Sequence, residues 1–143
     1  MKRRLKVYFI HSTKIDYTNE YYRYILSSPV CIRHELMLPQ TKNYQTKYVK
    51  DLINEADIIV AEVSKPTFGL KLELKWAFKS GKPIKYISLD NTIPKKVKKY
   101  VPEIEIIDDD KTFVKIIEDF ISFYADKSVE ELKNPTIVLG DLE

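Results

Sequence analysis

The sequence predicts a single α/β domain built on a mainly parallel sheet of about five strands. Three observations support this prediction. Strand-length apolar runs alternate along the chain with segments of helical periodicity. The run at residues 57–62 is apolar almost throughout, as expected for a central parallel strand that is covered on both faces. The chain has 143 residues, a length at which one domain can bury a substantial core.

The clearest elements follow from residue type and spacing. Residues 5–10 are β-branched and aromatic, which predicts a buried first strand. Apolar residues spaced three and four apart predict amphipathic helices over residues 16–28, 46–56 and 112–124. The first of these helices is expected to end at Pro29, because proline cannot continue a helix.

The remaining elements depend on shorter signals. A helix over residues 70–80 is followed by Gly81 and Pro83, which commonly end helices. The other strands are predicted at residues 30–34, 57–62 and 84–88 and, at one sheet edge, at 103–107. This order predicts a flavodoxin-like or Rossmann-like three-layer sandwich over residues 1–125. Residues 126–143 lack strong periodicity and are expected to form a C-terminal arm.

Composition excludes several functional classes. Lys and Arg number 24 against 21 Asp and Glu, and a net charge of +3 gives little support for nucleic-acid binding. The lysines within residues 95–99 are interpreted as a solvated helical face. One cysteine and two histidines favour neither a disulfide framework nor a metal cage, so we expect no metal. The absence of a membrane-length apolar run and of a signal peptide predicts a cytoplasmic protein without a membrane partner.

The predicted fold directs attention to the loops that follow the strands, because ligands of such sheets bind beyond the carboxyl ends of the strands. Glu73 lies near the start of the predicted helix that follows residues 57–62. There the helix dipole favours an ionised carboxylate, which can act as a nucleophile or stabilise a cation. A helix-capping role is the structural alternative for the same residue.

Several stretches of the chain resemble the nucleoside 2-deoxyribosyltransferase superfamily, and within it the 2′-deoxynucleoside 5′-monophosphate N-glycosidases. They are Lys-Val-Tyr-Phe-Ile-His-Ser (6–12), Ala-Asp-Ile-Ile-Val-Ala-Glu-Val-Ser-Lys-Pro-Thr-Phe-Gly (56–69), Leu-Glu-Leu (72–74) and Ser-Gly-Lys-Pro-Ile (80–84). The resemblance implies an enzyme that cleaves the N-glycosidic bond of a nucleoside or nucleotide, by hydrolysis or by transfer to a second base. It also implies that no cofactor is needed and that the protein forms a homo-oligomer.

The resemblance also implies roles for individual residues. Glu73 would attack C1′ of the sugar, expel the base and form a glycosyl-enzyme, while Tyr8 positions this nucleophile. Asp51 is the nearest match to an aspartate that handles the leaving base. The positions matching contacts to a 5′-phosphate are Ser12, Lys14 and Thr67.

Small residues of the family are replaced at three positions, by His11, Lys71 and Lys75. Glycine permits close approach of the backbone, so its loss predicts a changed or narrowed pocket. Lys71 is a candidate for recruiting an anionic substrate. His11 is a candidate for protonating the leaving base or contacting phosphate, with a plain loop histidine as the alternative.

Two hypotheses remain open at this point. The first is the glycosidase or transferase, with Glu62 as a candidate contact to a ribose hydroxyl and Gly69 as part of the binding loop. The second is a catalytically silent nucleotide-binding or sensing domain on the same scaffold. A cavity holding a buried, free Glu73 favours the enzyme, whereas a Lys71–Glu73 ion pair plugging the cleft favours the silent domain.

Overall fold

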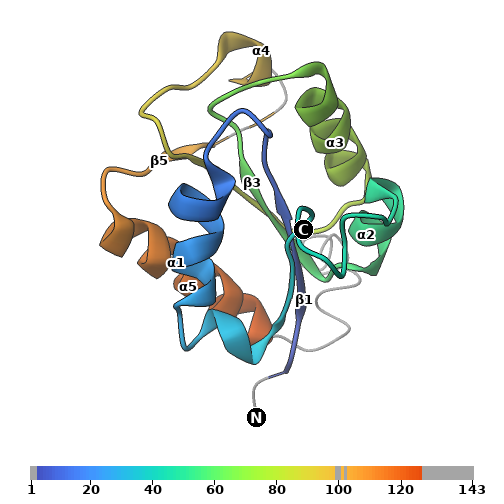
Figure 1. The fold of residues 1–143 in the computed structure, drawn as a ribbon, viewed down its shortest axis with the longest axis vertical. Coiled ribbons are helices and arrows are strands. Elements are labelled where there is room, and N and C mark those ends of the chain that lie inside the picture. The colour runs from blue at the N-terminus through green and yellow to red at the C-terminus, as the bar shows by residue number, and fades with distance from the viewer. Residues whose placement is uncertain (1–2, 99–100, 102, 127–143) are drawn as a thin grey trace, which may run out of the picture.

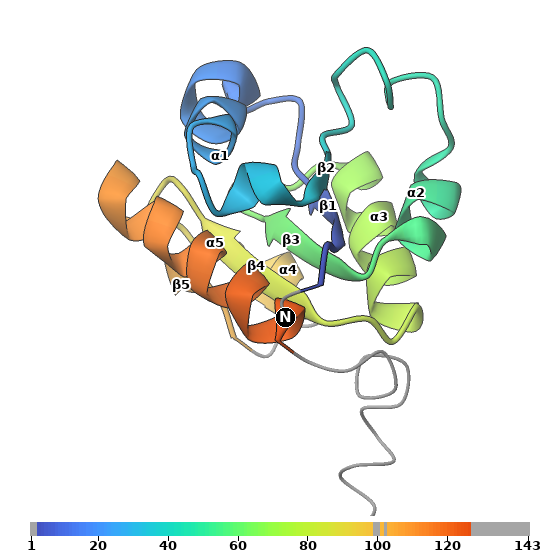
Figure 2. The ribbon, with the colours of Figure 1, turned by 90° about the horizontal axis from the view of Figure 1, so that it is seen from below.

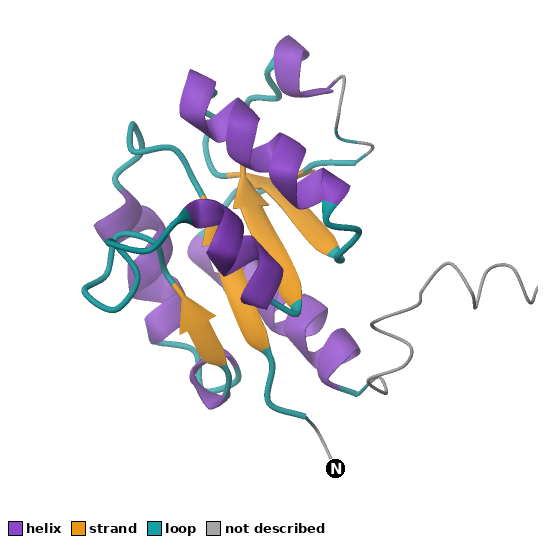
Figure 3. Ribbon diagram, turned by 90° about the vertical axis from the view of Figure 1, so that its right-hand side faces the viewer, coloured by secondary structure: helices purple, strands orange, loops and turns teal. Residues whose placement is uncertain are grey.

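The structure is a computed structural model that describes residues 3–98, 101 and 103–126 (Figure 1). Within them, five parallel strands form one sheet in the order β2-β1-β3-β4-β5, and their arrows point the same way in Figure 3. The strands are β1 (Lys6–Ile10), β2 (Glu35–Met37), β3 (Ile58–Glu62), β4 (Ile84–Ser88) and β5 (Glu105–Ile106). This order confirms the predicted flavodoxin-like α/β fold. The predicted C-terminal arm lies outside the described residues from residue 127 onward.

Helices cover both faces of the sheet (Figure 2). One face carries α1 (Arg23–Leu26), preceded by a π-helical turn (Thr18–Tyr22), and α5 (Asp110–Ala125). The other face carries α2 (Val49–Glu55) and α3 (Phe68–Lys79), and α4 (Lys95–Lys98) is a single short turn. None of the helices in the described part of the chain is long and apolar enough to cross a membrane.

Strand β1 distributes its side chains between two hydrophobic cores. Val7 and Phe9 pack in the core that contains residues of α1 and α5. Tyr8 and Ile10 pack in the core that contains residues of α2 and α3, because side chains alternate between the faces of a strand. All four are fully buried. The alternation therefore turns Tyr8 toward α3, the helix that contains Glu73.

The predicted second strand was wrong in position. Residues 30–34 contain a 3-10 turn at Cys31–Arg33, and β2 begins only at Glu35. Ser28 stabilises the turn, since its Oγ accepts a hydrogen bond from the Cys31 amide at 3.1 Å and its carbonyl accepts from the Ile32 amide. These local bonds satisfy backbone groups that a strand would have offered to its neighbours.

Alanine substitutions at two glycines, one within α3 and one just after it, are expected to have opposite effects on stability. Gly81 has φ +73°, so Gly81→Ala forces an L-residue into the left-handed region and should cost about 1 kcal/mol of unfolding free energy. Gly69 lies within α3, and the nearest atom to an added Cβ is 3.9 Å away, so Gly69→Ala should stabilise by up to about 1 kcal/mol. Urea unfolding measures both; a change of the same sign in the two variants would contradict this reasoning.

Candidate functional site

A cavity of about 200 Å³ opens at the carboxyl ends of the strands, on the α2–α3 side of the sheet. It lies where strand order reverses between β1 and β3, the position at which such folds bind ligands. It brings together six of the residues predicted from the sequence, namely Tyr8, His11, Ser12, Thr67, Gly69 and Glu73. Its other wall comes from residues 39–48, here called the β2–α2 loop, which contributes Pro39, Gln40, Tyr44, Gln45 and Lys47.

Tyr8 and Glu73 form a hydrogen-bonded pair in this cavity. The Tyr8 hydroxyl donates to Glu73 Oε1 at 3.1 Å. Burial raises the pKa of Glu73 to about 7, and the Tyr8 hydrogen bond partly offsets this by favouring the carboxylate. Burial, followed by the nearby Glu73 charge, raises the pKa of Tyr8, so the phenol remains a donor. The pair thus presents a carboxyl group that titrates near neutral pH.

The reason expected for the ionisation of Glu73 was wrong. Helix α3 begins at Phe68, two residues earlier than predicted, so Glu73 lies beyond its first turn. The helix dipole acts mainly on charges within that first turn, whereas burial disfavours the charged form of a carboxyl group at any position along the helix. The pKa of Glu73 is therefore raised, in the direction opposite to the one that a helix N-terminus favours.

His11 lines the cavity, and both of its ring nitrogens are hydrogen-bonded within the protein. Its Nδ1 is 3.0 Å from the Ser12 carbonyl oxygen, which can only accept, so Nδ1 carries a proton. Its Nε2 is 2.5 Å from the Tyr22 hydroxyl, and burial lowers the pKa of His11 below its ordinary value. Because burial disfavours the charged ring, we assign Nε2 as the acceptor of the Tyr22 proton.

Of the three predicted phosphate contacts, Ser12 and Thr67 line the cavity and Lys14 does not. Ser12 is buried and its Oγ accepts the Lys14 amide at 3.0 Å, while the Lys14 side chain is exposed and does not line the cavity. Thr67 caps α3, because its Oγ1 accepts the Leu70 amide at 3.0 Å. Lys47 is the one lysine among the described residues that line the cavity. Its ammonium nitrogen lies over the Tyr44 ring, 5.6 Å from the ring centroid.

Besides Lys14, three further predicted residues do not line the cavity: Asp51, Glu62 and Lys71. Asp51 is exposed in the first turn of α2. Lys71 lines a separate hollow between α3 and α4, with Lys75 and Val97, and the described residues include no Lys71–Glu73 ion pair. The feature expected of a plugged cleft is therefore not seen.

Glu62 is fully buried and holds two loops at the carboxyl edge of the sheet. Its Oε1 accepts from the amide and hydroxyl of Ser64, at 3.1 and 2.9 Å, and its Oε2 accepts from the Leu89 amide at 2.7 Å. Burial raises the pKa of Glu62, while these hydrogen bonds oppose the shift. Its carboxyl oxygens thus connect the loops that follow β3 and β4.

Sequence reasoning missed the wall supplied by the β2–α2 loop. Gln40, Tyr44 and Gln45 lie in a polar stretch without periodicity, where no local pattern indicates which side chains face inward. One usable signal was present, since residues between a strand and a helix at this edge of a parallel sheet are placed near any ligand.

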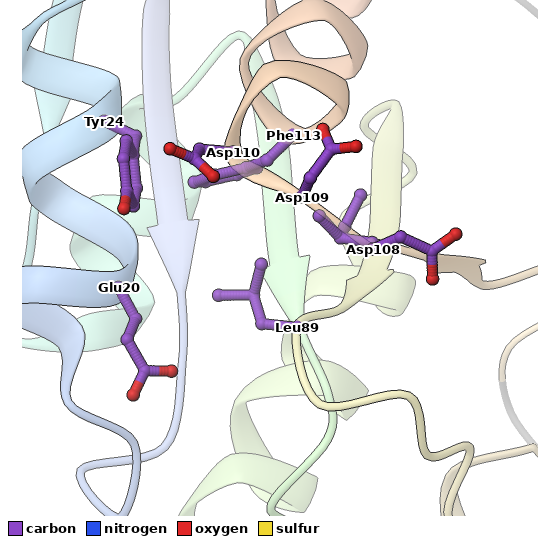
Figure 4. Close-up of a pocket in the computed structure, with 8 residues that line it drawn as sticks. Glu20, Tyr24, Leu89, Asp108, Asp109, Asp110 and Phe113 are labelled. Carbon is purple, nitrogen blue, oxygen red and sulfur yellow. The ribbon is translucent and has the colours of Figure 1, made fainter.

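A second hollow, of about 150 Å³, lies between the start of α5 and the segment leading into α1 (Figure 4). Its walls carry the acidic residues Glu20, Asp108, Asp109 and Asp110 around Leu89 and Phe113. The carboxylates of Asp108 and Asp110 point in different directions in Figure 4, and Asp109 caps α5 through the Thr112 amide at 2.7 Å. In the described part of the chain there is no group of three or more His, Cys, Asp or Glu residues that could hold a metal ion.

Comparison with known proteins finds similarity in structure rather than in sequence. No protein-family model matches the chain, and no curated protein matches its sequence. Among solved structures, the chain is similar to the CMP N-glycosidase BcmB of Clostridium botulinum, with a TM-score of 0.60 and 18% sequence identity. The match covers 80% of this chain and 98% of that one. At this level of identity, the finding establishes that the two proteins share a fold.

Proposed function

We propose that this protein cleaves the N-glycosidic bond of a nucleoside or nucleoside 5′-monophosphate, with Glu73 as the nucleophile and Tyr8 as its positioning residue. The observation that carries the proposal is the Tyr8–Glu73 pair, 3.1 Å apart, in a cavity at the switch point of the sheet. The fold shared with a CMP N-glycosidase supports it, as does the resemblance of residues 56–84 to enzymes of that chemistry.

The chemistry suits a buried carboxylate. As the bond between C1′ and the base nitrogen breaks, its electron pair leaves with the base and positive charge develops on the sugar. An oxygen of Glu73 stabilises that charge and bonds to C1′; water then attacks C1′, frees Glu73 and supplies the proton that balances the released base. Tyr8 engages Oε1, which leaves Oε2 for the attack, since no hydrogen bond of the described residues involves it.

The β2–α2 loop supplies groups suited to a base. Gln40 and Gln45 each carry an amide that can both donate and accept, and Tyr44 offers an aromatic face. These side chains line the same cavity as Glu73. A nucleoside with its sugar at Glu73 and its base toward the loop meets hydrogen-bonding and stacking partners of these kinds.

Release of free base tests the proposal. We expect the wild-type protein to liberate base from at least one member of a panel of ribo- and deoxyribonucleosides and their 5′-monophosphates, detected by chromatography. Adding a second base separates hydrolysis from transfer, because transfer yields a new nucleoside. Calorimetric binding of a panel member with no base released, even at high enzyme concentration, would instead identify a catalytically silent nucleotide-binding domain.

A further inference from the structure

We propose that Tyr22 is a positioning residue of this site, because its hydroxyl joins His11 on the loop after β1 to the backbone of the β2–α2 loop and holds that loop at the cavity. The tether itself is independent of the reaction, while its effect on substrate rests on the proposed function. Tyr22 belongs to the π-helical turn on the opposite side of the sheet from α3. It therefore couples the catalytic cavity to a helix that does not line it.

The hydrogen bonds of the tether run in one direction. The Gln40 amide donates to the Tyr22 hydroxyl oxygen at 3.0 Å. The Tyr22 hydroxyl lies 2.5 Å from His11 Nε2, and His11 Nδ1 lies 3.0 Å from the Ser12 carbonyl. An amide only donates and a carbonyl only accepts, and with an uncharged His11 ring each proton in the chain then has one place: on Gln40 N, on Tyr22 Oη and on His11 Nδ1.

Packing fixes the inner end of the tether. His11 and Tyr22 are each 5% exposed. The His11 ring stacks on Tyr17 at 4.8 Å between centroids, and the rings of Tyr21 and Tyr22 meet it edge-on at 5.5 and 5.1 Å. Leaving a member of such a buried chain without its hydrogen bond costs free energy. The Tyr22 hydroxyl is therefore held in a fixed position, where it accepts the hydrogen bond from the Gln40 amide of the loop.

The outer end of the tether has few other attachments. Within the β2–α2 loop, the described hydrogen bonds are local ones, such as those from the Tyr44 and Gln45 amides to the Thr41 carbonyl. The Tyr44 hydroxyl also donates to Glu35 of the flanking strand β2 at 3.3 Å. Apart from the local bonds and those to the flanking elements, the described bond that reaches the rest of the fold is that from the Gln40 amide to Tyr22. Losing the Tyr22 hydroxyl should therefore free the start of the loop.

Hydrogen exchange tests the tether without any substrate. In Tyr22→Phe, which keeps the ring, we expect the loop amides that make hydrogen bonds, such as those of Gln40, Tyr44 and Gln45, to exchange about tenfold faster, while β1 and β3 stay protected. Tyr21→Phe is the matched control, because Tyr21 is an adjacent buried tyrosine whose hydroxyl donates to the Ile10 carbonyl at 3.4 Å instead. Unchanged exchange of the loop in Tyr22→Phe, or equal acceleration in Tyr21→Phe, would overturn the proposal.

The wild-type protein provides a second readout if Tyr22→Phe does not fold. The Gln40 amide should exchange more slowly than those of Lys42 and Asn43, which make no hydrogen bonds in the described structure. Equal exchange at the three amides would overturn the tether. This measurement by NMR requires no substitution.

Kinetics then test the positioning role on a substrate that the base-release panel identifies. Because Tyr8 and Glu73 are untouched, Tyr22→Phe should raise KM about tenfold and change kcat by less than about twofold. A loosened loop with an unchanged KM would overturn the role in positioning. If the wild-type protein releases no base, the proposed function fails, while the exchange results still decide whether the tether exists.

Discussion

Replacing Glu73 by glutamine is expected to reduce base release at least about 1,000-fold, because an amide cannot form the glycosyl-enzyme. Glutamine matches the size of glutamate, and its carbonyl oxygen can still accept the Tyr8 hydrogen bond seen at 3.1 Å. The fold and the cavity should therefore be retained. Single-turnover release of base from the best substrate measures the effect. A variant with near wild-type rate would remove Glu73 from the role of nucleophile.

The same substitution should make the protein more stable above pH 7. Burial raises the pKa of Glu73 from 4.5 to about 7, so the folded state holds this proton more tightly than the unfolded state does. The stabilising effect of protonation is complete below the unfolded pKa and is lost as pH rises through about 7. Glu73→Gln stays neutral throughout, and at pH 8 it should gain on the order of 2 kcal/mol over wild type.

Urea unfolding at pH 5 and pH 8 measures this gain, which should be larger at pH 8. Glu62→Gln is the matched control, since Glu62 is also buried but its oxygens accept three hydrogen bonds. Glutamine at that position directs an amide donor at another donor, so it should destabilise the protein. If Glu73→Gln were instead less stable than the wild type at pH 8, the Glu73 carboxylate would stabilise the fold. It would then not be a charged group that the fold buries at a cost in stability.

The sequence was sufficient to predict the layers of the fold, and it indicated the sheet edge at which the candidate site lies, because those features depend on strong local patterns. The continuous apolar run of β3 indicated a central strand, and the structure places β3 between β1 and β4. Gly81 after α3 indicated a helix end, and its φ of +73° explains the choice of glycine. Tyr8 and Glu73 were paired only through a family resemblance, yet strand alternation is what turns them toward each other.

Other features depend on contacts that no local pattern encodes. Val30 and Ile32 have the β-branched side chains of a strand, but Ser28 draws the following backbone into a 3-10 turn. The pKa of Glu73 depends on how deeply packing buries its carboxyl group, which the position of the residue in a helix does not reveal. The chain from Gln40 through Tyr22 to His11 spans three separate segments, and it becomes visible only when the fold brings them together.

Replacing Tyr8 by phenylalanine is expected to shift the pH profile of the reaction toward alkaline pH. The nucleophile must be ionised, so kcat/KM of the wild-type enzyme should rise with pH through the pKa of Glu73, about 7. The Tyr8 hydroxyl lowers that pKa by bonding to the carboxylate, and its loss should therefore raise it further. At pH 7, less of the variant carries the reactive form, and the remaining carboxylate is less well oriented.

We therefore expect Tyr8→Phe to lower kcat/KM at pH 7 by about 10- to 100-fold, with part of the loss recovered at pH 9. Tyr86→Phe serves as the control: Tyr86 is a buried tyrosine of β4 in the same core, and its hydroxyl is not bonded to Glu73. Its profile should match that of the wild type. A Tyr8→Phe profile with an unshifted midpoint would mean that the hydrogen bond positions Glu73 without tuning its ionisation. If the midpoint of the rise in kcat/KM moved to lower pH, that rise could not be assigned to the ionisation of Glu73. Removing a hydrogen-bond donor from a carboxylate can only raise its pKa.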